Sequence, residues 1–326
     1  MKRRPKVVVL ATGGTIAGKG KPGDVAGYRP GAISIHSLTQ SISGLGEIAD
    51  IEEIQVSNIN SDDITSSLWL RLAGLINTLS LRDDIDGFVI THGTDTMEET
   101  AFFLHLVVKT EKPVVVTGAM RPSTATSADG PINLYQSIVV ASSREARGKG
   151  VVCVFSDSIY CARDFQKLST TSVTAFGGRD FGMMGYVLDR RVLLYNTSLK
   201  PHTTASEFSV DGISSLPKVG ILLFHVDADP SLISFAAKGN DGLVIVGAGN
   251  GNYSKAYNEA IGELSIPVVR SSRIGNGMIV PDSAFDKWRN IILGDNLAPT
   301  KARILLILAL MKTRDREKIQ EYFNRY

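Results

Sequence analysis

VVVLATGGTIAG, residues 7–18, joins a short apolar run to a pair of glycines. Five consecutive apolar residues are too few for a helix, and they predict a strand that is buried on both faces. Gly13 and Gly14 can adopt positive φ and let the backbone approach a ligand closely. The segment therefore predicts a turn that presents the hydroxyl of Thr15 at the carboxyl end of a sheet strand.

A second segment, DGFVITHGTDT at residues 86–96, follows the same pattern. A buried strand again leads into a glycine-containing turn that carries hydroxyl groups, and Glu98 and Glu99 suit the first turn of a following helix. Two such turns at the same edge of one sheet would face each other. Taken singly, either turn is equally well explained as an ordinary connection between a strand and a helix, with no functional role.

The first two thirds of the chain alternate between strand-like and helix-like segments. We expect strands at 51–59, 86–91, 113–117 and 150–156, helices at 64–80, 96–109 and 131–147, and short antiparallel strands within 176–200. Strands separated by helices need crossover connections, and the sequence therefore predicts a mainly parallel sheet flanked by helices.

A polar segment rich in Ser and Thr, residues 201–217, separates this region from a second and smaller alternation. In the second region we expect strands at 219–225, 242–247 and 266–270 and helices at 230–238, 254–264, 299–312 and 314–324. The sequence thus predicts an α/β protein with an N-terminal domain over 1–200, a linker over 201–217 and a smaller C-terminal α/β domain over 218–326.

The composition is that of an ordinary globular protein. The 326 residues are 43% hydrophobic and 21% charged, and the 35 basic and 33 acidic residues are interspersed. A net charge of +2 creates no strong field for nucleic acid or an anionic membrane. No apolar run reaches the length of a membrane span, which is about 18 residues or more.

The first residues and the two cysteines also bear on the class of protein. Lys2, Arg3 and Arg4 resemble the start of a signal peptide, but Pro5 follows and the apolar run soon ends at the glycines. We therefore expect a cytoplasmic protein as the chain is written, or a periplasmic one if a leader was removed.

Two cysteines are too few for a disulfide framework, and no Cys/His spacing indicates a metal site.

The two glycine turns resemble the paired signatures of bacterial type II L-asparaginases. Five further stretches share the resemblance in order along the chain: GAMRPSTATSADGPINLY at 118–135, ARDFQKLSTT at 162–171, GAGNGN at 247–252, VRSSRIGNG at 269–277 and KARILLILAL at 301–310. The resemblance implies hydrolysis of L-asparagine to L-aspartate and ammonia through an acyl-enzyme, with weaker activity on L-glutamine and no cofactor. It also implies a homotetramer, a dimer of dimers, with sites shared between subunits.

The resemblance assigns the reacting groups. Thr15 would be the threonine that is acylated, with Tyr28 beside it on a flap within residues 19–32, while Thr94, Asp95 and Lys167 would form a connected set. Thr94 would activate water or polarise the scissile carbonyl, and the sequence does not divide this work between the two threonines. By composition alone, Lys167 is far more often a solvated loop lysine, because lysine is almost never buried without a partner.

The resemblance also assigns the groups that would hold the substrate: Ser61 and Asp62 at its α-carboxylate and α-amino end, Thr94 and Asp95 at the reacting and ammonium ends, the backbone carbonyl of Ala119 at its amide nitrogen, and Asn250 from a neighbouring subunit. Many relatives carry Gln where this chain has Asp62. We hypothesise that this carboxylate favours asparagine over glutamine. A glutamate that some relatives contribute has no counterpart near Asp282 and Ser283.

The same residues bear on three other functions. No G-x-S-x-G motif occurs, so the sequence offers no nucleophile for an α/β-hydrolase triad. His92 is the only histidine near either turn, and it is equally a packing residue. A dinucleotide fingerprint fails because Thr15 stands where its second glycine is needed and no ribose-binding acid follows the strand ending near Ser57. An amino-acid sensor remains an alternative, although it would need no proton acceptor beside two hydroxyls.

Overall fold

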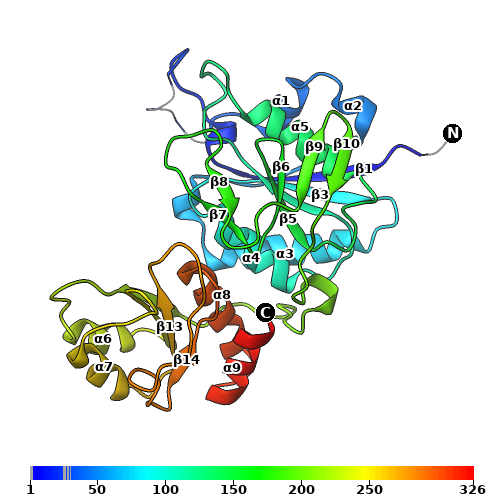
Figure 1. Cartoon of the computed structure of the whole chain (residues 1–326). Helices are drawn as coiled ribbons and strands as arrows, with labels where there is room; N and C mark the ends of the chain where they lie inside the picture. Colours follow the sequence, from blue (N-terminus) through cyan, green and yellow to red (C-terminus); the bar gives the residue numbers. More distant parts are fainter. Residues whose placement is uncertain (1–2, 25–26, 28, 30) are drawn as a thin grey trace. The chain divides into compact units, whose positions relative to one another are not determined.

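The computed structural model describes residues 3–24, 27, 29 and 31–326. It divides between Gly212 and Ile213 into two compact units (Figure 1). The division falls inside the polar segment 201–217. The larger unit holds a mainly parallel sheet and the smaller unit a separate parallel sheet, so the predicted α/β fold class is confirmed.

The sheet of the first unit has eight strands in the order β10-β9-β6-β5-β4-β3-β1-β2. Its strands are β1 (Lys6–Gly13), β2 (Asp50–Ile59), β3 (Gly87–Thr91), β4 (Val114–Thr117), β5 (Val151–Phe155), β6 (Ser158–Cys161), β9 (Gly185–Leu188) and β10 (Arg191–Leu194). The strands β1 to β5 pair in parallel, and β6, β9 and β10 add the expected antiparallel end.

Strand β1 lies inside this sheet, between β2 and β3. Residues 7–13 are buried, as the apolar run predicts for a strand covered on both faces. Because β1, β2 and β3 are parallel neighbours, their carboxyl ends meet at one edge of the sheet. We call this the carboxyl edge, and it is where both glycine turns begin.

Helices cover both faces of the sheet (Figure 1). They are α1 (Ile35–Gln40), α2 (Leu45–Ile48) and α5 (Gly130–Ala141) on one face, and α3 (Ser66–Ser80) and α4 (Met97–Val107) on the other. The core on the α5 side joins residues of alternate positions along β1, such as Val7 and Val9, to Leu134 and Ile138. This alternation is what a strand buried between two helical layers requires.

Element boundaries differ from the sequence expectation in identifiable ways. Helix α3 begins at Ser66 because the Thr65 side chain accepts the N–H of Leu68 as a cap. Helix α5 ends at Ala141, well before the expected end, and the Ser142 hydroxyl donates to the carbonyl of Ile138 in its last turn. The two short helices α1 and α2 and several strands were not expected, since segments of three to six residues show no reliable period.

One unexpected strand, β7, and one strand from the expected antiparallel segment 176–200, β8, form a separate two-stranded ribbon. Strand β7 (Phe165–Lys167) pairs antiparallel with β8 (Phe176–Gly178), and Lys167 lies opposite Phe176. The ring of Phe165 stacks on that of Phe176 at 4.4 Å between centroids, and Phe176 also packs against Phe155 of β5 at 4.7 Å, which holds the ribbon against the main sheet. Lys167 therefore sits on a short strand and not on a free loop.

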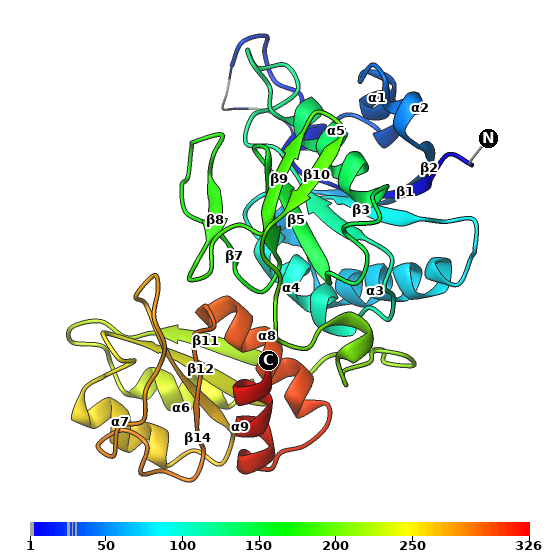
Figure 2. The same ribbon diagram turned by 45° about the vertical axis from the view of Figure 1, so that its right-hand side comes forward.

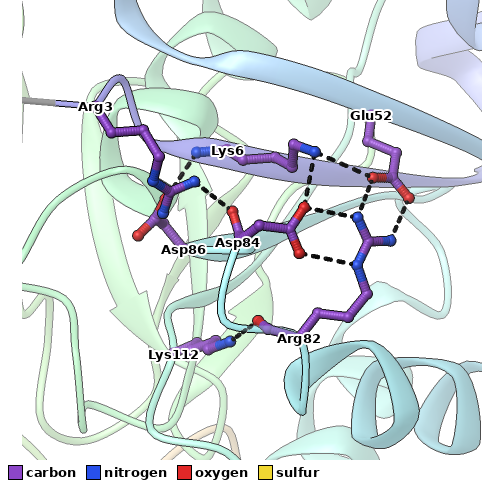
Figure 3. Close-up of polar contacts among 7 residues, drawn as sticks. All are labelled: Arg3, Lys6, Glu52, Arg82, Asp84, Asp86 and Lys112. Atoms are coloured by element: carbon purple, nitrogen blue, oxygen red, sulfur yellow. Dashed lines mark hydrogen bonds and ion pairs between the residues drawn. The ribbon is translucent and has the colours of Figure 1, made fainter.

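At the opposite, amino edge of the sheet lies a network of charged side chains, which we call the amino-edge network (Figure 3). Arg82 donates to both carboxylate oxygens of Glu52, at 3.0 and 2.9 Å, and to both of Asp84, at 3.0 and 2.8 Å. Lys6 Nζ donates to Asp84 at 2.8 Å, and Arg3 donates to Asp86 at 2.8 Å. The guanidinium holds the pKa of the Asp84 carboxyl far below its usual range.

The second unit is built on a four-stranded parallel sheet in the order β11-β12-β13-β14 (Figure 2). Its elements are β11 (Val219–Leu223), α6 (Ser231–Ala237), β12 (Gly242–Gly247), α7 (Lys255–Gly262), β13 (Val268–Ser272), β14 (Ile291–Leu293), α8 (Pro299–Leu310) and α9 (Arg316–Arg325). Ile233 of α6 and Tyr257 and Ile261 of α7 share a core with the strands. Helix α8 carries buried residues along most of its length.

Candidate active site

Three turns meet at the carboxyl edge of the eight-stranded sheet. Gly14 has φ of 78°, and a Cβ built on it would lie 2.4 Å from the Cα of Gly93. A Cβ on Gly93 would in turn lie 2.8 Å from the side chain of Ser61. Only glycine permits this approach, because any Cβ at these positions would overlap the neighbouring turn. The turns after β1, β2 and β3 are therefore in direct contact.

The turn after β1 places Thr15 at the start of a short 3₁₀ helix, Thr15–Ala17. Thr15 is almost completely buried, with 5% of its surface exposed. The neighbouring Thr12 hydroxyl donates to the carbonyl of Thr91 at 2.9 Å, which ties the end of β1 to the end of β3. The first and second glycine turns are thus held side by side, as the sequence predicted for two turns at one edge.

The turn after β3 carries Thr94 and Asp95, and Lys167 reaches it from β7. The Lys167 ammonium nitrogen lies 3.0 Å from Thr94 Oγ1 and 2.5 Å from Asp95 Oδ1. About 19% of the Lys167 side chain and 57% of the Asp95 side chain are exposed. The structure therefore brings the three residues of the expected set together, with an amine joining a hydroxyl to a carboxylate.

The backbone of Lys167 is held by a residue that sequence reasoning had placed only as a helix-start carboxylate. Glu98, in the first turn of α4, accepts the Lys167 backbone N–H at 3.0 Å. This bond joins α4 to the end of β7 and sets where the lysine side chain leaves the ribbon. No sequence signal links residues 98 and 167, because the contact spans 69 positions.

The turn after β2 contributes Ser61 and Asp62. Ser61 is buried, its hydroxyl accepts the backbone N–H of Asp95 at 3.3 Å, and its carbonyl accepts the Thr96 hydroxyl at 2.8 Å. Asp62 is exposed and accepts from the Asn60 side-chain amide at 3.0 Å. Ser61 thus directly supports the turn that carries Asp95, while Asp62 lies at the rim.

Ala119 follows β4 at the same edge and is fully buried. A Cβ on Gly130 would lie 3.4 Å from the Ala119 side chain and 3.0 Å from that of Ile16. The Asp129 carboxylate, which the sequence did not single out, accepts the backbone N–H groups of Met120 and Arg121 at 2.9 Å each. The segment containing Ala119 is therefore fixed close to the turn that carries Thr15.

Asn250 belongs to the second unit, beyond the carboxyl end of β12. Its side-chain amide donates to the carbonyl of Val280 at 3.0 Å, and its amide oxygen accepts the Val280 N–H at 2.9 Å. Asp282 likewise accepts a local N–H, that of Ala284, at 2.9 Å. Both side chains stabilise the loop after β13. Tyr28 lies outside the described residues.

His92 is a fully buried packing residue under the second glycine turn. Trp69 Nε1 donates to the Thr100 hydroxyl at 2.8 Å, and this hydroxyl lies 2.9 Å from His92 Nε2. His92 Nδ1 lies 2.7 Å from the carbonyl of Gly93, so the network assigns the proton of a neutral ring to Nδ1. Burial lowers the pKa of His92 to about 4.

The described residues hold no group of three or more His, Cys, Asp or Glu placed to bind a metal ion. Within the same part of the chain no helix is long and apolar enough to cross a membrane. A pocket of about 930 Å³ lies between α5 and the β9–β10 hairpin, and none of the predicted site residues lines it.

Two family models match the chain. The one described as "Asparaginase, N-terminal" matches residues 6–200, and the one described as "Glutaminase/Asparaginase C-terminal domain" matches residues 218–323. These matches cover most of the chain and agree with the resemblance found in the glycine turns.

Individual relatives lead to the same family. The chain is 42% identical over 327 residues to L-asparaginase 2 of Escherichia coli (strain K12), covering 99% of this chain and 93% of that protein. It is 39% identical over 331 residues to the glutaminase-asparaginase of Pseudomonas fluorescens biotype A, covering 98% and 90%. The crystal structure of a probable cytoplasmic L-asparaginase from Campylobacter jejuni matches with a TM-score of 0.96 and 43% identity, over 99% of this chain and 100% of that one. The chain therefore belongs to the bacterial type II L-asparaginase family and is a hydrolase that acts on amide bonds.

Proposed function

We propose that the protein hydrolyses L-asparagine to L-aspartate and ammonia with Thr15 as the nucleophile. The observation that carries the proposal is the contact of the Lys167 amine with both Thr94 Oγ1 and Asp95 Oδ1. Thr94 and Asp95 belong to the turn after β3, and this turn packs against the turn that carries Thr15. The match to L-asparaginase 2 of Escherichia coli along nearly the whole chain supports the choice of substrate.

The reaction proceeds in two halves. Thr15 Oγ attacks the side-chain carbonyl carbon of asparagine, its proton is passed to the leaving nitrogen, and ammonia departs from an ester on Thr15. Water then attacks the ester and releases aspartate. In this second half the Lys167 amine receives the proton of the attacking water through the Thr94 hydroxyl, the Asp95 carboxylate stabilises the ammonium that forms, and the proton then passes to Thr15 Oγ as the ester bond breaks. Tyr28 is the proposed neighbour of Thr15 in the first half.

Substrate recognition follows from the charges around the turns. Asparagine carries an α-ammonium and an α-carboxylate, and Asp95 and Asp62 are the carboxylates at this edge that suit the ammonium. The Ser61 hydroxyl, at the base of the same turn, is the proposed donor to the α-carboxylate. The carbonyl of Ala119 would accept from the substrate amide nitrogen, which orients the scissile bond.

Release of ammonia from L-asparagine tests the proposal. Thr15→Ala should lower kcat/KM by about 10³-fold or more, because the acyl-enzyme can no longer form. Thr15→Ser keeps a hydroxyl and should retain measurable turnover, and Thr171→Ala, at an exposed threonine, should match the native protein. A native protein that binds asparagine and liberates no ammonia would be a sensor, and the proposal would fail.

We also propose that activity on L-glutamine is weaker and that Asp62 contributes to the preference. The two substrates differ by one methylene, and pocket discrimination of a methylene amounts to ~1–3 kcal/mol. Asp62→Gln should narrow the ratio of asparagine to glutamine turnover, whereas Asp63→Gln, at the adjacent exposed carboxylate, should not. An unchanged ratio in Asp62→Gln would remove Asp62 from the explanation.

A homotetramer with sites shared between subunits is the proposed active form. The stretch GAGNGN at 247–252 supports it, because in the resemblance Asn250 acts in the site of a neighbouring subunit. Sedimentation of the native protein during turnover is the direct measurement. A fully active monomer would contradict the shared site and leave the reaction at Thr15 unaffected.

A further inference from the structure

A pocket of about 260 Å³ lies in the second unit, and none of the residues assigned to the reaction lines it. Three chain segments form it: 262–267, 289–290 and 314–316. Pro267 immediately precedes β13 and Asn290 immediately precedes β14, so the pocket opens at the amino edge of the four-stranded sheet. Asn250 follows the carboxyl end of β12 and therefore lies beyond the opposite edge.

The lining of this pocket is strongly basic. Arg289, Arg314 and Arg316 all contribute to it, and none of its described lining residues is Asp or Glu. Asp241, outside the lining, accepts one N–H of Arg314 at 2.9 Å. Arg289 is exposed and forms no ion pair with any residue that the structure describes. The pocket therefore carries an excess of positive charge.

The walls of the pocket are fixed without a ligand. The Asn290 side-chain amide donates to the carbonyls of Ile261 at 2.9 Å and Leu264 at 3.1 Å, which holds the turn after α7. Arg316 Nε donates to the carbonyl of Ile291 at 2.7 Å and joins the start of α9 to β14. A ligand would therefore not need to order these walls on binding, which lowers the entropic cost of binding.

We propose that this pocket is a binding site for one small dianion per chain, such as a phosphate or a short dicarboxylate. The planar guanidinium group matches the paired oxygen atoms of both ligands and forms short, charge-assisted hydrogen bonds to them. Amino acids should bind less well than a dicarboxylate without an amine, because no carboxylate lines the pocket to receive an ammonium group. This inference is independent of the reaction proposed at Thr15.

Isothermal titration calorimetry of the full-length protein at low ionic strength tests the site, with inorganic phosphate and succinate titrated separately. We expect that at least one of the two probes, phosphate or succinate, binds saturably with a stoichiometry of one per chain. The Arg289→Gln and Arg314→Gln double variant should weaken it by about tenfold or more, in keeping with loss of charge-assisted bonds. Arg144→Gln, at an exposed arginine of the first unit, should stay within about twofold.

The outcomes separate the possible sources of the anion. Binding of phosphate alone supports a tetrahedral oxyanion, and binding of succinate alone supports a dicarboxylate. Arg289→Gln alone serves as a second variant, because Arg289 supports no other described residue and its loss should leave the circular dichroism spectrum unchanged. Absence of saturable binding by both probes, or equal weakening by Arg144→Gln, would overturn the proposal.

Discussion

At the amino edge of the eight-stranded sheet, Lys6 Nζ lies 2.8 Å from a carboxylate oxygen of Asp84, and at the carboxyl edge Lys167 Nζ lies 2.5 Å from one of Asp95. The two lysines differ in their second partner. For Lys6 it is another carboxylate, that of Glu52 at 3.9 Å, and for Lys167 it is the hydroxyl of Thr94 at 3.0 Å. A hydroxyl can relay a proton between an amine and a bound substrate, whereas the Glu52 carboxylate is already paired with Arg82 and mainly compensates charge.

The groups around the two lysines also differ in whether their charges are compensated. In the amino-edge network Arg82 saturates Glu52 and Asp84 with paired hydrogen bonds, so cations and carboxylates cancel one another (Figure 3). At the carboxyl edge the groups come from three turns that glycines bring into contact. Ion pairing alone therefore does not mark the candidate site. An amine shared between a carboxylate and a hydroxyl, beside a second buried hydroxyl, does.

The largest expected effect comes from replacing each lysine in turn. Lys167→Met should lower kcat for asparagine by about 10³-fold, because general acid–base groups contribute 10²–10⁴-fold and the Thr94 hydroxyl also loses its partner. Lys6→Met removes a lysine with a similar ion pair and should leave kcat within about twofold of native. Ammonia release under saturating asparagine measures both. Comparable losses in the two variants would mean that the difference between the edges has no catalytic meaning.

The edges should also respond to acid in different pH ranges. His92 has a pKa of about 4 when folded and about 6.5 when unfolded, so between these values only the unfolded chain takes up a proton. Its contribution to stability is complete above pH 6.5 and falls by about 3 kcal/mol as the pH drops to 4. Asp84 has a lowered pKa, so the stability it contributes is present above the usual carboxyl pKa and is lost only as the pH falls below that value.

Urea unfolding of the first unit at pH 7, 5.5 and 4.5 measures this dependence. His92→Gln should flatten the loss of stability between pH 6.5 and 4.5, since the neutral amide takes up no proton in either state. His36→Gln, which changes an exposed histidine paired with Glu53, is the matched control and should retain the native slope. An unchanged slope in His92→Gln would show that other groups govern this range.

Glu98 provides the next, smaller effect. Its carboxylate accepts the Lys167 backbone N–H at 3.0 Å, so this bond holds the backbone of the lysine and not its side-chain amine. Glu98→Ala should let the end of β7 shift and lower kcat by about tenfold, with KM within about twofold, because reactivity depends steeply on position. Glu98→Gln keeps an acceptor oxygen and should recover most of the activity. Equal losses in both variants would point to the charge of Glu98 and not to its hydrogen bond.

The sequence predicted the carboxyl edge well and the amino edge not at all. The apolar run at 7–11 and the shorter one at 88–90 predict buried strands, and the glycines that follow them predict the turns. The resemblance to type II L-asparaginases, now confirmed, named Lys167, whereas composition alone favoured a solvated loop. The three-residue strand β7 that carries it is too short to show a period. The individual roles of the site residues remain predictions.

The amino-edge network escaped prediction for a physical reason. Its residues are scattered from Arg3 to Lys112, and they meet only because β2 and β3 flank β1 in the sheet. Strand order of this kind is set by the packing of the whole unit, and no local pattern encodes it. The pairing of Asn250 with Val280 across 30 positions is the same kind of contact.

Arg82→Gln should give the smallest effect. The variant loses paired hydrogen bonds to Glu52 and Asp84, but the group lies at the surface, where solvent and salt already screen the charges. We expect an unchanged kcat and, at low salt, a Tm lower than that of the native protein. The difference in Tm should shrink in about 0.5 M NaCl, because the Debye length then falls below ~5 Å. Arg71→Gln, an arginine of α3 that donates only to the carbonyl of Val56, should show no such salt dependence. If Arg82→Gln instead lowers kcat, the amino edge is coupled to the site through β1 and β3, and the two edges do not act independently.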